Sequence, residues 1–327
     1  MKNFIIKFLL FLFAIILGII VLDIYISRSL KTANVYAVGE YNTWNDLFNG
    51  DINSKVVIYG SSKAWQHISP AILAQKIPTT FYNLGIDGHN FDLQYLRHEL
   101  LLERNNQPKY IIQEVDEFTL TKYENLYNLQ QFLPYMLWNF KIEDCISKFN
   151  GFNTFDYKIP LLRYYKTKGS VRVAFQLYKN ELPNNKTRFK GYQGLDFGSK
   201  FSSKDLKKLR YKVEVDKAFV LLFDAFLKEC KQKNIKVILV NTPEFIEGQK
   251  CVINRKETMN LFTRFSKKYK VPFYDYSNDS ISYNKELFYN ALHMNKRGSE
   301  IFSAKFADQV KKDILFTVKH QTSNIKH

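Results

Sequence analysis

The sequence predicts an α/β protein built on a mainly parallel five-stranded sheet and preceded by a membrane-spanning helix. Five short apolar segments alternate with amphipathic helical segments along much of the chain. That alternation favours a parallel sheet with helices on both faces, because each strand must be followed by a crossover. The first 30 residues are apolar and lack a polar face. Between residues 118 and 205 the alternation stops.

The N-terminal segment is long enough to cross a bilayer as a helix. Phe8 to Leu22 contains no charged residue, and the apolar character extends from Phe4 to Ile26. A cleaved signal peptide would need small residues after the apolar core, whereas Asp23 to Arg28 are mostly bulky. We therefore expect an uncleaved membrane anchor over residues 1–30.

The orientation of this anchor depends on the basic residues that flank it. Lys2, Lys7 and the α-amino group lie on one side, and Arg28 and Lys31 lie on the other. The positive-inside rule leans slightly towards an inner N-terminus. The body of the chain, residues 31–327, is then expected in the periplasm or outside the cell.

The predicted strands are apolar runs that end at turn-forming or polar residues. They cover residues 55–59, 80–84, 110–115, 235–241 and 271–276. Helical periodicity is found over residues 70–76, 91–105, 213–232, 252–269 and 296–315. Ser69 followed by Pro70 is a typical helix start.

The segment from about residue 118 to 205 is rich in Tyr, Phe, Asn and Lys. We interpret it as an insertion of helices and loops that covers one end of the α/β domain. Its aromatic and basic side chains could form a wall for binding sugars, or the segment could be a lid that only covers the sheet.

Composition limits the partners and cofactors. The net charge of +17 suits anionic surroundings. The basic residues are scattered, however, with neither a long basic run nor a zinc-finger motif, so we do not expect nucleic acid as a partner. Three cysteines without short spacing, Cys145, Cys230 and Cys251, indicate neither a metal site nor a disulfide framework. We expect no metal and no cofactor.

The candidate site residues follow the predicted strands, because ligands of such sheets bind beyond the carboxyl ends of the strands. Ser62 comes after the first strand, in Gly-Ser-Ser, and Gly85 comes after the second. His293 precedes the last helix, where a base could reach Ser62. His67 and His89 follow the first two strands and could also line the cleft. Taken singly, each of these residues also fits a cap, a turn or a structural role.

Together these motifs resemble the SGNH/GDSL hydrolase superfamily. Gly60-Ser61-Ser62, Asn83-x-Gly85 and His293 five residues before Gly298 carry the resemblance, which covers about residues 54–115 and 233–312. It implies a flavodoxin-like five-stranded parallel sheet, Ser62 as nucleophile and His293 as general base. It also implies that the backbone N–H groups of Ser62 and Gly85 form the oxyanion hole. The chain looks most like membrane-anchored cell-envelope members, including DltD-like D-alanyl transfer proteins.

The sequence departs from the family at two positions. Asp116 stands near the place of a neutral oxyanion donor, where a carboxylate would repel the oxyanion. Asn241 could supply the donor instead. Asn290 stands three residues before His293, where the family has an Asp. The site is then a Ser62–His293 dyad, or Asp275 or Asp279 supplies the acid, or the protein is a weak or inactive relative.

The resemblance implies an esterase or O-acyltransferase that acts on acyl esters of surface polysaccharides or lipids. The alternative is a protein without catalytic activity that binds a glycan or assists a membrane-bound acyltransferase. Asn290 and Asp116 favour the alternative, and the convergence of Ser62 and His293 would favour the enzyme.

Overall fold

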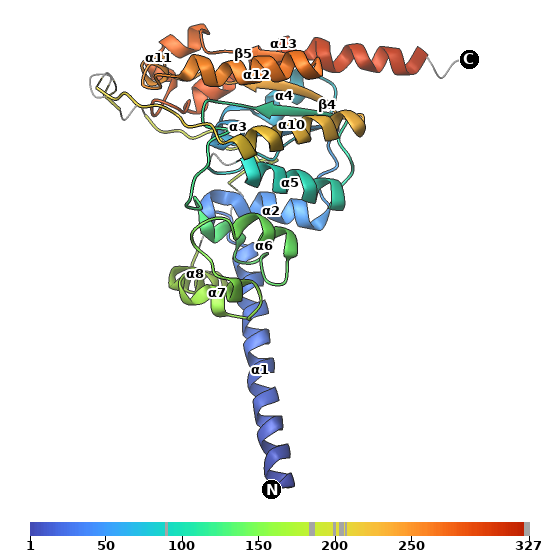
Figure 1. The fold of residues 1–327 in the computed structure, drawn as a ribbon, viewed down its shortest axis with the longest axis vertical. Coiled ribbons are helices and arrows are strands. Elements are labelled where there is room, and N and C mark those ends of the chain that lie inside the picture. Colours follow the sequence, from blue (N-terminus) through green and yellow to red (C-terminus); the bar gives the residue numbers. More distant parts are fainter. Residues whose placement is uncertain (89–90, 183–186, 199–200, 203–205, 207, 324–327) are drawn as a thin grey trace. The chain divides into compact units, whose positions relative to one another are not determined.

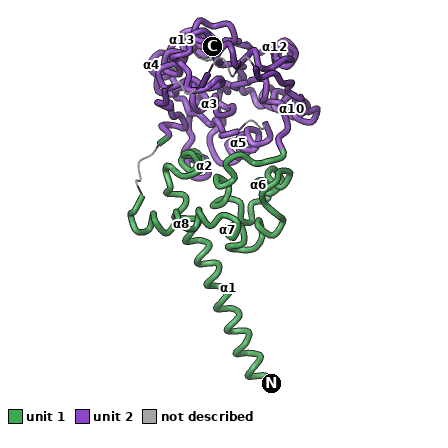
Figure 2. Tube along the Cα trace, turned by 90° about the vertical axis from the view of Figure 1, so that its left-hand side faces the viewer, with its two compact units in different colours: residues 1–45, 124–187 green, residues 46–123, 188–327 purple. Residues whose placement is uncertain are grey.

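The computed structural model describes residues 1–88, 91–182, 187–198, 201–202, 206 and 208–323. The chain divides into two compact units (Figure 2). Unit 1 combines residues 1–45 with residues 124–187, and unit 2 combines residues 46–123 with residues 188–327. The N-terminal helix and most of the expected insertion therefore belong to one unit.

Unit 2 contains the predicted five-stranded parallel sheet. The strand order is β2-β1-β3-β4-β5, and every neighbouring pair is parallel. This is the flavodoxin-like order, so the predicted fold class is confirmed. The strands are β1 (Val56–Tyr59), β2 (Phe81–Asn83), β3 (Tyr110–Glu114), β4 (Lys236–Asn241) and β5 (Phe273–Asp275).

Helices cover both faces of this sheet (Figure 1). On one face α3 and α4 pack against α13, and on the other α10 packs against α5 and α12. The bounds are α3 (Ser62–His67), α4 (Pro70–Lys76), α5 (Phe91–Arg104), α10 (Lys217–Gln232), α11 (Ile246–Gln249), α12 (Arg255–Tyr269) and α13 (Lys296–Ser323), with the 3-10 helices η4 (Ser280–Tyr283) and η5 (Lys285–Leu287).

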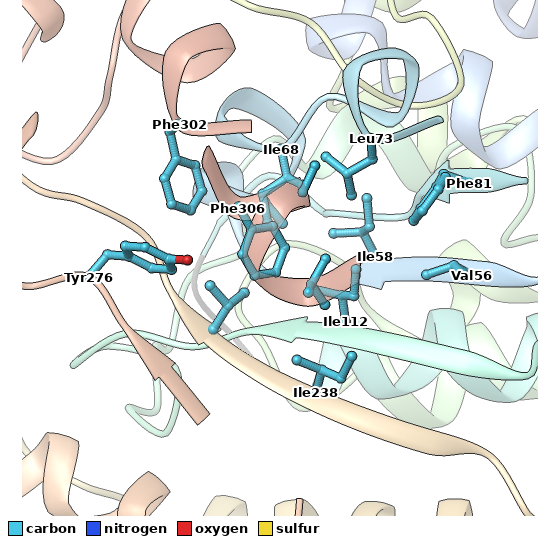
Figure 3. Packing of buried hydrophobic residues seen from close by; sticks show 14 of the residues in the cluster. Val56, Ile58, Ile68, Leu73, Phe81, Ile112, Ile238, Tyr276, Phe302 and Phe306 are labelled. Carbon is cyan, nitrogen blue, oxygen red and sulfur yellow. The ribbon is translucent and has the colours of Figure 1, made fainter. Parts of the chain in front are cut away.

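The core of unit 2 explains why these strand sequences are so apolar. Helices cover both faces of the sheet, so strand side chains such as Ile58, Ile112 and Ile238 are almost completely buried. Phe302 and Phe306 of α13 close this core from one side (Figure 3). As predicted, the Ser69 side chain caps α4 by accepting a hydrogen bond from the Ile72 N–H.

Unit 1 is made of helices and loops. Its elements are α1 (Lys2–Lys31), η1 (Tyr36–Gly39), η2 (Leu129–Phe132), α6 (Phe140–Ile146), η3 (Thr154–Tyr157), α7 (Leu162–Tyr165) and α8 (Lys168–Tyr178). Helix α2 (Glu40–Asn49) begins in unit 1 and ends in unit 2. Among the described residues, α1 is the one helix long and apolar enough to span a membrane, and its most apolar 18-residue window is not buried by protein. An N-terminal apolar helix of this kind fits a single-pass anchor or a signal sequence.

Candidate active site

The turn after β1 places Ser62 at the start of α3. Gly60 has φ of +143°, and a Cβ there would lie 2.6 Å from the Cβ of Glu114, so this turn requires glycine. Ser61 is the N-cap, with its Oγ accepting from the Lys63 N–H at 3.2 Å. Ser62 is thereby held at the carboxyl end of the sheet, with 7% of its surface exposed.

His293 lies in the loop before α13 and faces Ser62. Its Nε2 is 2.8 Å from the Ser62 Oγ, and its Nδ1 is 3.1 Å from the Asn290 Oδ1. The structure therefore brings together the serine and the histidine that the sequence singled out. The Tyr289 ring stacks on the imidazole, with ring centroids 5.6 Å apart.

The hydrogen bonds of Asn290 fix the tautomer of His293. The Asn290 Oδ1 accepts from the backbone N–H groups of Leu292 and His293, so this atom is an oxygen and an acceptor. The imidazole Nδ1 must then carry the proton that it donates to Oδ1. Nε2 is left unprotonated and can accept the Ser62 hydroxyl proton, which is the arrangement a general base requires.

The two alternative acids have their described contacts elsewhere. The Asp275 Oδ1 accepts from the Ser277 N–H at 3.0 Å. Asp279 caps η4 through the Ile281 N–H and forms an ion pair with Lys305. The residue beside the His293 Nδ1 is Asn290, so the third member of this site is neutral.

The structure shows hydrogen bonds within the fold at Gly85 and Asn241, and their role as oxyanion donors stays a prediction. The Gly85 N–H donates to the Asn83 Oδ1 at 2.9 Å, and the Asn241 amide donates to the Val115 carbonyl at 2.9 Å. The Ser62 N–H remains a candidate, since it lies in the first turn of α3, where backbone N–H groups lack intrahelical acceptors.

A second histidine, His67 at the end of α3, contacts the loop that contains His293. Its Nε2 accepts from the Met294 N–H at 3.0 Å, and its Nδ1 lies 2.8 Å from the Thr242 Oγ1. Burial holds the pKa of His67 well below its usual value, which keeps the ring neutral and Nε2 free to accept. The sequence suggested that His67 could line the cleft, but it did not reveal this link to the residue after His293. His89 lies outside the described residues.

A buried cluster of charges lies behind Ser62. The Lys63 Nζ is 2.9 Å from the Asp116 Oδ2 and also contacts Glu244. Arg255 pairs with Glu117 at 3.5 Å and with Glu244 at 3.8 Å. The carboxylate of Asp116 thus faces a lysine, and the expected repulsion of an oxyanion is offset by that positive charge.

Burial and the crowding of carboxylates shift the protonation of this cluster. Desolvation and the neighbouring Glu244 raise the pKa of Glu117 to about 8, and burial raises the pKa of Glu114 well above its usual value. Burial alone would lower the pKa of Lys63, but Asp116 and Glu244 outweigh it and raise that pKa. The cluster therefore holds Lys63 charged.

Among the described residues, no group of three or more His, Cys, Asp and Glu side chains is arranged to hold a metal ion. Cys145, Cys230 and Cys251 are all buried, and none of them forms a disulfide.

Comparison with known proteins gives little beyond this geometry. No family model matches the sequence, and no curated protein matches it. A solved structure of a Bacteroides fragilis protein called a "putative acylhydrolase" is similar at 12% identity, over 82% of this chain and 93% of that chain, with a TM-score of 0.37. A likeness of this degree supports no inference about activity.

Proposed function

We propose that this chain is a membrane-anchored ester hydrolase or O-acyltransferase of the SGNH type that works through Ser62 and His293. The observation that carries the proposal is the 2.8 Å contact between the Ser62 Oγ and an unprotonated His293 Nε2. A serine hydroxyl is a weak nucleophile by itself and needs an adjacent base in this geometry.

The reaction proceeds in two half-reactions. The Ser62 Oγ attacks the carbonyl carbon of an acyl ester while His293 Nε2 takes the hydroxyl proton. The tetrahedral oxyanion collapses, the ester C–O bond breaks, and His293 returns the proton to the leaving alkoxide. Water or a glycan hydroxyl then attacks the acyl-enzyme with His293 again as base, which regenerates Ser62.

The substrates in this proposal are acylated surface polysaccharides or lipids. Helix α1 acts as an uncleaved anchor, with the body of the chain in the periplasm or outside the cell. An esterase on the cell envelope would meet O-acylated glycans there, and a membrane-bound acyltransferase is the partner that could supply or receive the acyl group. The basic and aromatic composition of residues 118–205 supports an acidic or sugar-containing substrate.

A second candidate function is a protein that keeps this fold but binds a glycan or assists an acyltransferase without catalysis. The neutral Asn290 beside the His293 Nδ1 favours it, since Asn cannot stabilise an imidazolium by charge. The occupied N–H of Gly85 favours it too.

Labelling with a fluorophosphonate distinguishes the two functions. The full chain in mild detergent is expected to react, and Ser62→Ala is expected to abolish the reaction. Ser280→Ala, at an exposed serine of the same unit, is the matched control and should label normally. Absence of labelling in the folded wild-type protein would leave the binding function as the better one.

A further inference from the structure

Helix α1 has two different surfaces along its length. Up to Leu22 its side chains are almost all exposed, whereas Asp23, Ile26, Ser27 and Leu30 are buried within unit 1. About 20 residues of helix cross the apolar core of a bilayer. A span that begins near Lys2 therefore ends near Asp23, which places the first contacts between α1 and the rest of unit 1 at the membrane boundary.

An ion pair fixes α1 to unit 1 at that level. The two carboxylate oxygens of Asp23 accept from Arg163 at 2.6 and 2.7 Å, and the Leu161 N–H donates to Asp23 at 2.6 Å. The paired side chains are almost completely buried. Because this contact is bidentate and enclosed, α1 has a defined position against α7 and α8.

A cavity of about 460 Å³, open to solvent, lies between α1 and α8 and extends across this level. Val21 and Ile24 line it on the side of the membrane span, and Arg28, Ser29 and Thr32 line it one to two turns further along α1. From Val21 to Thr32 the helix rises about 16 Å. The lining thus changes from apolar to cationic and hydroxyl-bearing along the direction of the membrane normal.

Helix α8 supplies the opposite wall. Leu177 and Tyr178 line the cavity, and the Tyr178 ring meets the ring of Tyr25 edge-on at 5.6 Å. Tyrosine rings are typical of the membrane interface, where one end is apolar and the other is solvated. The cavity therefore has the sequence of environments that a glycerophospholipid presents: acyl chain, glycerol ester region and phosphate.

The charge around the cavity favours an anionic lipid. The last turn of α1 contains Arg28 and Lys31, and α8 contains no acidic residue. Cations near a membrane surface attract anionic headgroups, each with an energy of about 1 kcal/mol.

We propose that the cavity between α1 and α8 binds one anionic glycerophospholipid of the surrounding bilayer. Its phosphate lies at Arg28, and one acyl chain lies along Val21 and Ile24. The site requires that α1 spans the membrane, as in the proposed function, but it does not depend on the chemistry of Ser62.

Native mass spectrometry of the full chain in mild detergent tests this site. The protein is mixed with equal amounts of dioleoylphosphatidylglycerol and dioleoylphosphatidylcholine, and bound lipid is identified by its mass. We expect one phosphatidylglycerol to be retained in preference to phosphatidylcholine. Arg28→Gln should weaken its retention about fivefold, the value of one cation at an anionic surface. Leu177→Trp, which places a larger ring in the wall of the cavity, should weaken it as well.

Arg172→Gln is the matched control, because Arg172 is an exposed cation of α8 that does not line the cavity. It should retain the lipid like the wild type. If Arg28→Gln and Arg172→Gln lose phosphatidylglycerol equally, the proposed site is wrong and the lipid is held by diffuse attraction to the protein surface. Equal retention of the two lipids, or of neither, would overturn the proposed site as well. Because the readout is lipid mass, fluorophosphonate labelling of Ser62 can succeed or fail independently.

Discussion

At the scale of single residues, Asn290 determines how His293 can act. It holds the imidazole in the tautomer that leaves Nε2 free for Ser62, as an aspartate would. It adds no negative charge, so in the proposed acyl transfer the imidazolium is stabilised less than in a triad with an acid. The site has the geometry for general base catalysis, but it lacks the negative charge that an aspartate would place beside His293.

Asn290→Asp is expected to raise esterase activity. The new carboxylate can still accept from the Leu292 and His293 N–H groups and adds the missing charge. We expect kcat to rise by at least about tenfold, within the roughly 10⁴-fold that the reverse change costs in a serine triad. Hydrolysis of p-nitrophenyl acetate measures it. Asn284→Asp, at a capping position, is the control and should not change kcat. Unchanged activity in folded Asn290→Asp would contradict the role given to Asn290.

His67 is expected to act as a positioning residue for His293. His67→Phe removes the acceptor of the buried Met294 N–H, which costs about 1–3 kcal/mol and loosens the loop. We expect kcat to fall with little change in KM, because His67 supports the histidine without facing substrate. His67→Gln retains an acceptor and should recover part of kcat. A rise in KM alone would assign His67 to substrate binding instead.

At the scale of elements, the short helix α3 organises the site. It has six residues, too few to be stable alone, so contacts at both ends must hold it. Lys63 binds it to the buried carboxylates at one end, and His67 binds it to Thr242 and Met294 at the other. Ser62 is the first residue of this helix, directly before Lys63.

The sequence predicted the strands and the facing pair because both depend on local pattern. Strand β1 is apolar along its whole length and β4 is apolar between its two ends, and parallel strands bring Ser62 and the His293 loop to one edge of the sheet. The contacts of Gly85, Asn241 and Asp116 could not be predicted. Each depends on which distant partner, such as Lys63 beside Asp116, lies within hydrogen-bonding distance after folding.

The charge cluster behind α3 predicts how stability depends on pH. The pKa of Glu117 is about 8 in the folded protein and near 4.5 when unfolded, so the folded state binds the extra proton between these values. The free energy of unfolding is therefore expected to fall as pH rises from about 4.5 to about 8, by an amount on the order of a few kcal/mol.

Glu117→Gln should flatten this dependence, as measured by urea denaturation at pH 5, 6, 7 and 8 (about the window of the shift). Glu257→Gln, at an exposed position of α12, is the control and should keep the wild-type slope. A slope of the opposite sign in the wild-type protein would show that Glu117 is not protonated in the folded state.

At the scale of the whole molecule, the boundary between anchor and body differs from the one that the sequence suggested. The sequence separated residues 1–30 from an insertion at 118–205. In the structure the last turns of α1 and residues 124–187 form one unit. Hydropathy identifies the span, but it does not reveal that Asp23, which interrupts the apolar run, pairs with Arg163 about 140 residues later.

Removing one partner of this pair should destabilise unit 1. Asp23→Ala leaves Arg163 buried without its carboxylate, which typically costs about 3–5 kcal/mol. Asp23→Leu combined with Arg163→Met should recover much of that loss. Thermal unfolding of the full chain in detergent measures both. Asp144→Ala, at an exposed ion pair, is the control and should change little. A neutral effect of Asp23→Ala would contradict the enclosed pair.

The central claim is that His293 activates Ser62 as a nucleophile. The most direct test is tandem mass spectrometry of the full chain, quenched in acid shortly after mixing with p-nitrophenyl acetate. We predict an acetyl group on Ser62, absent from Ser62→Ala and strongly reduced in His293→Ala. Acetylation at another residue, or none in the folded wild-type protein, would contradict the claim.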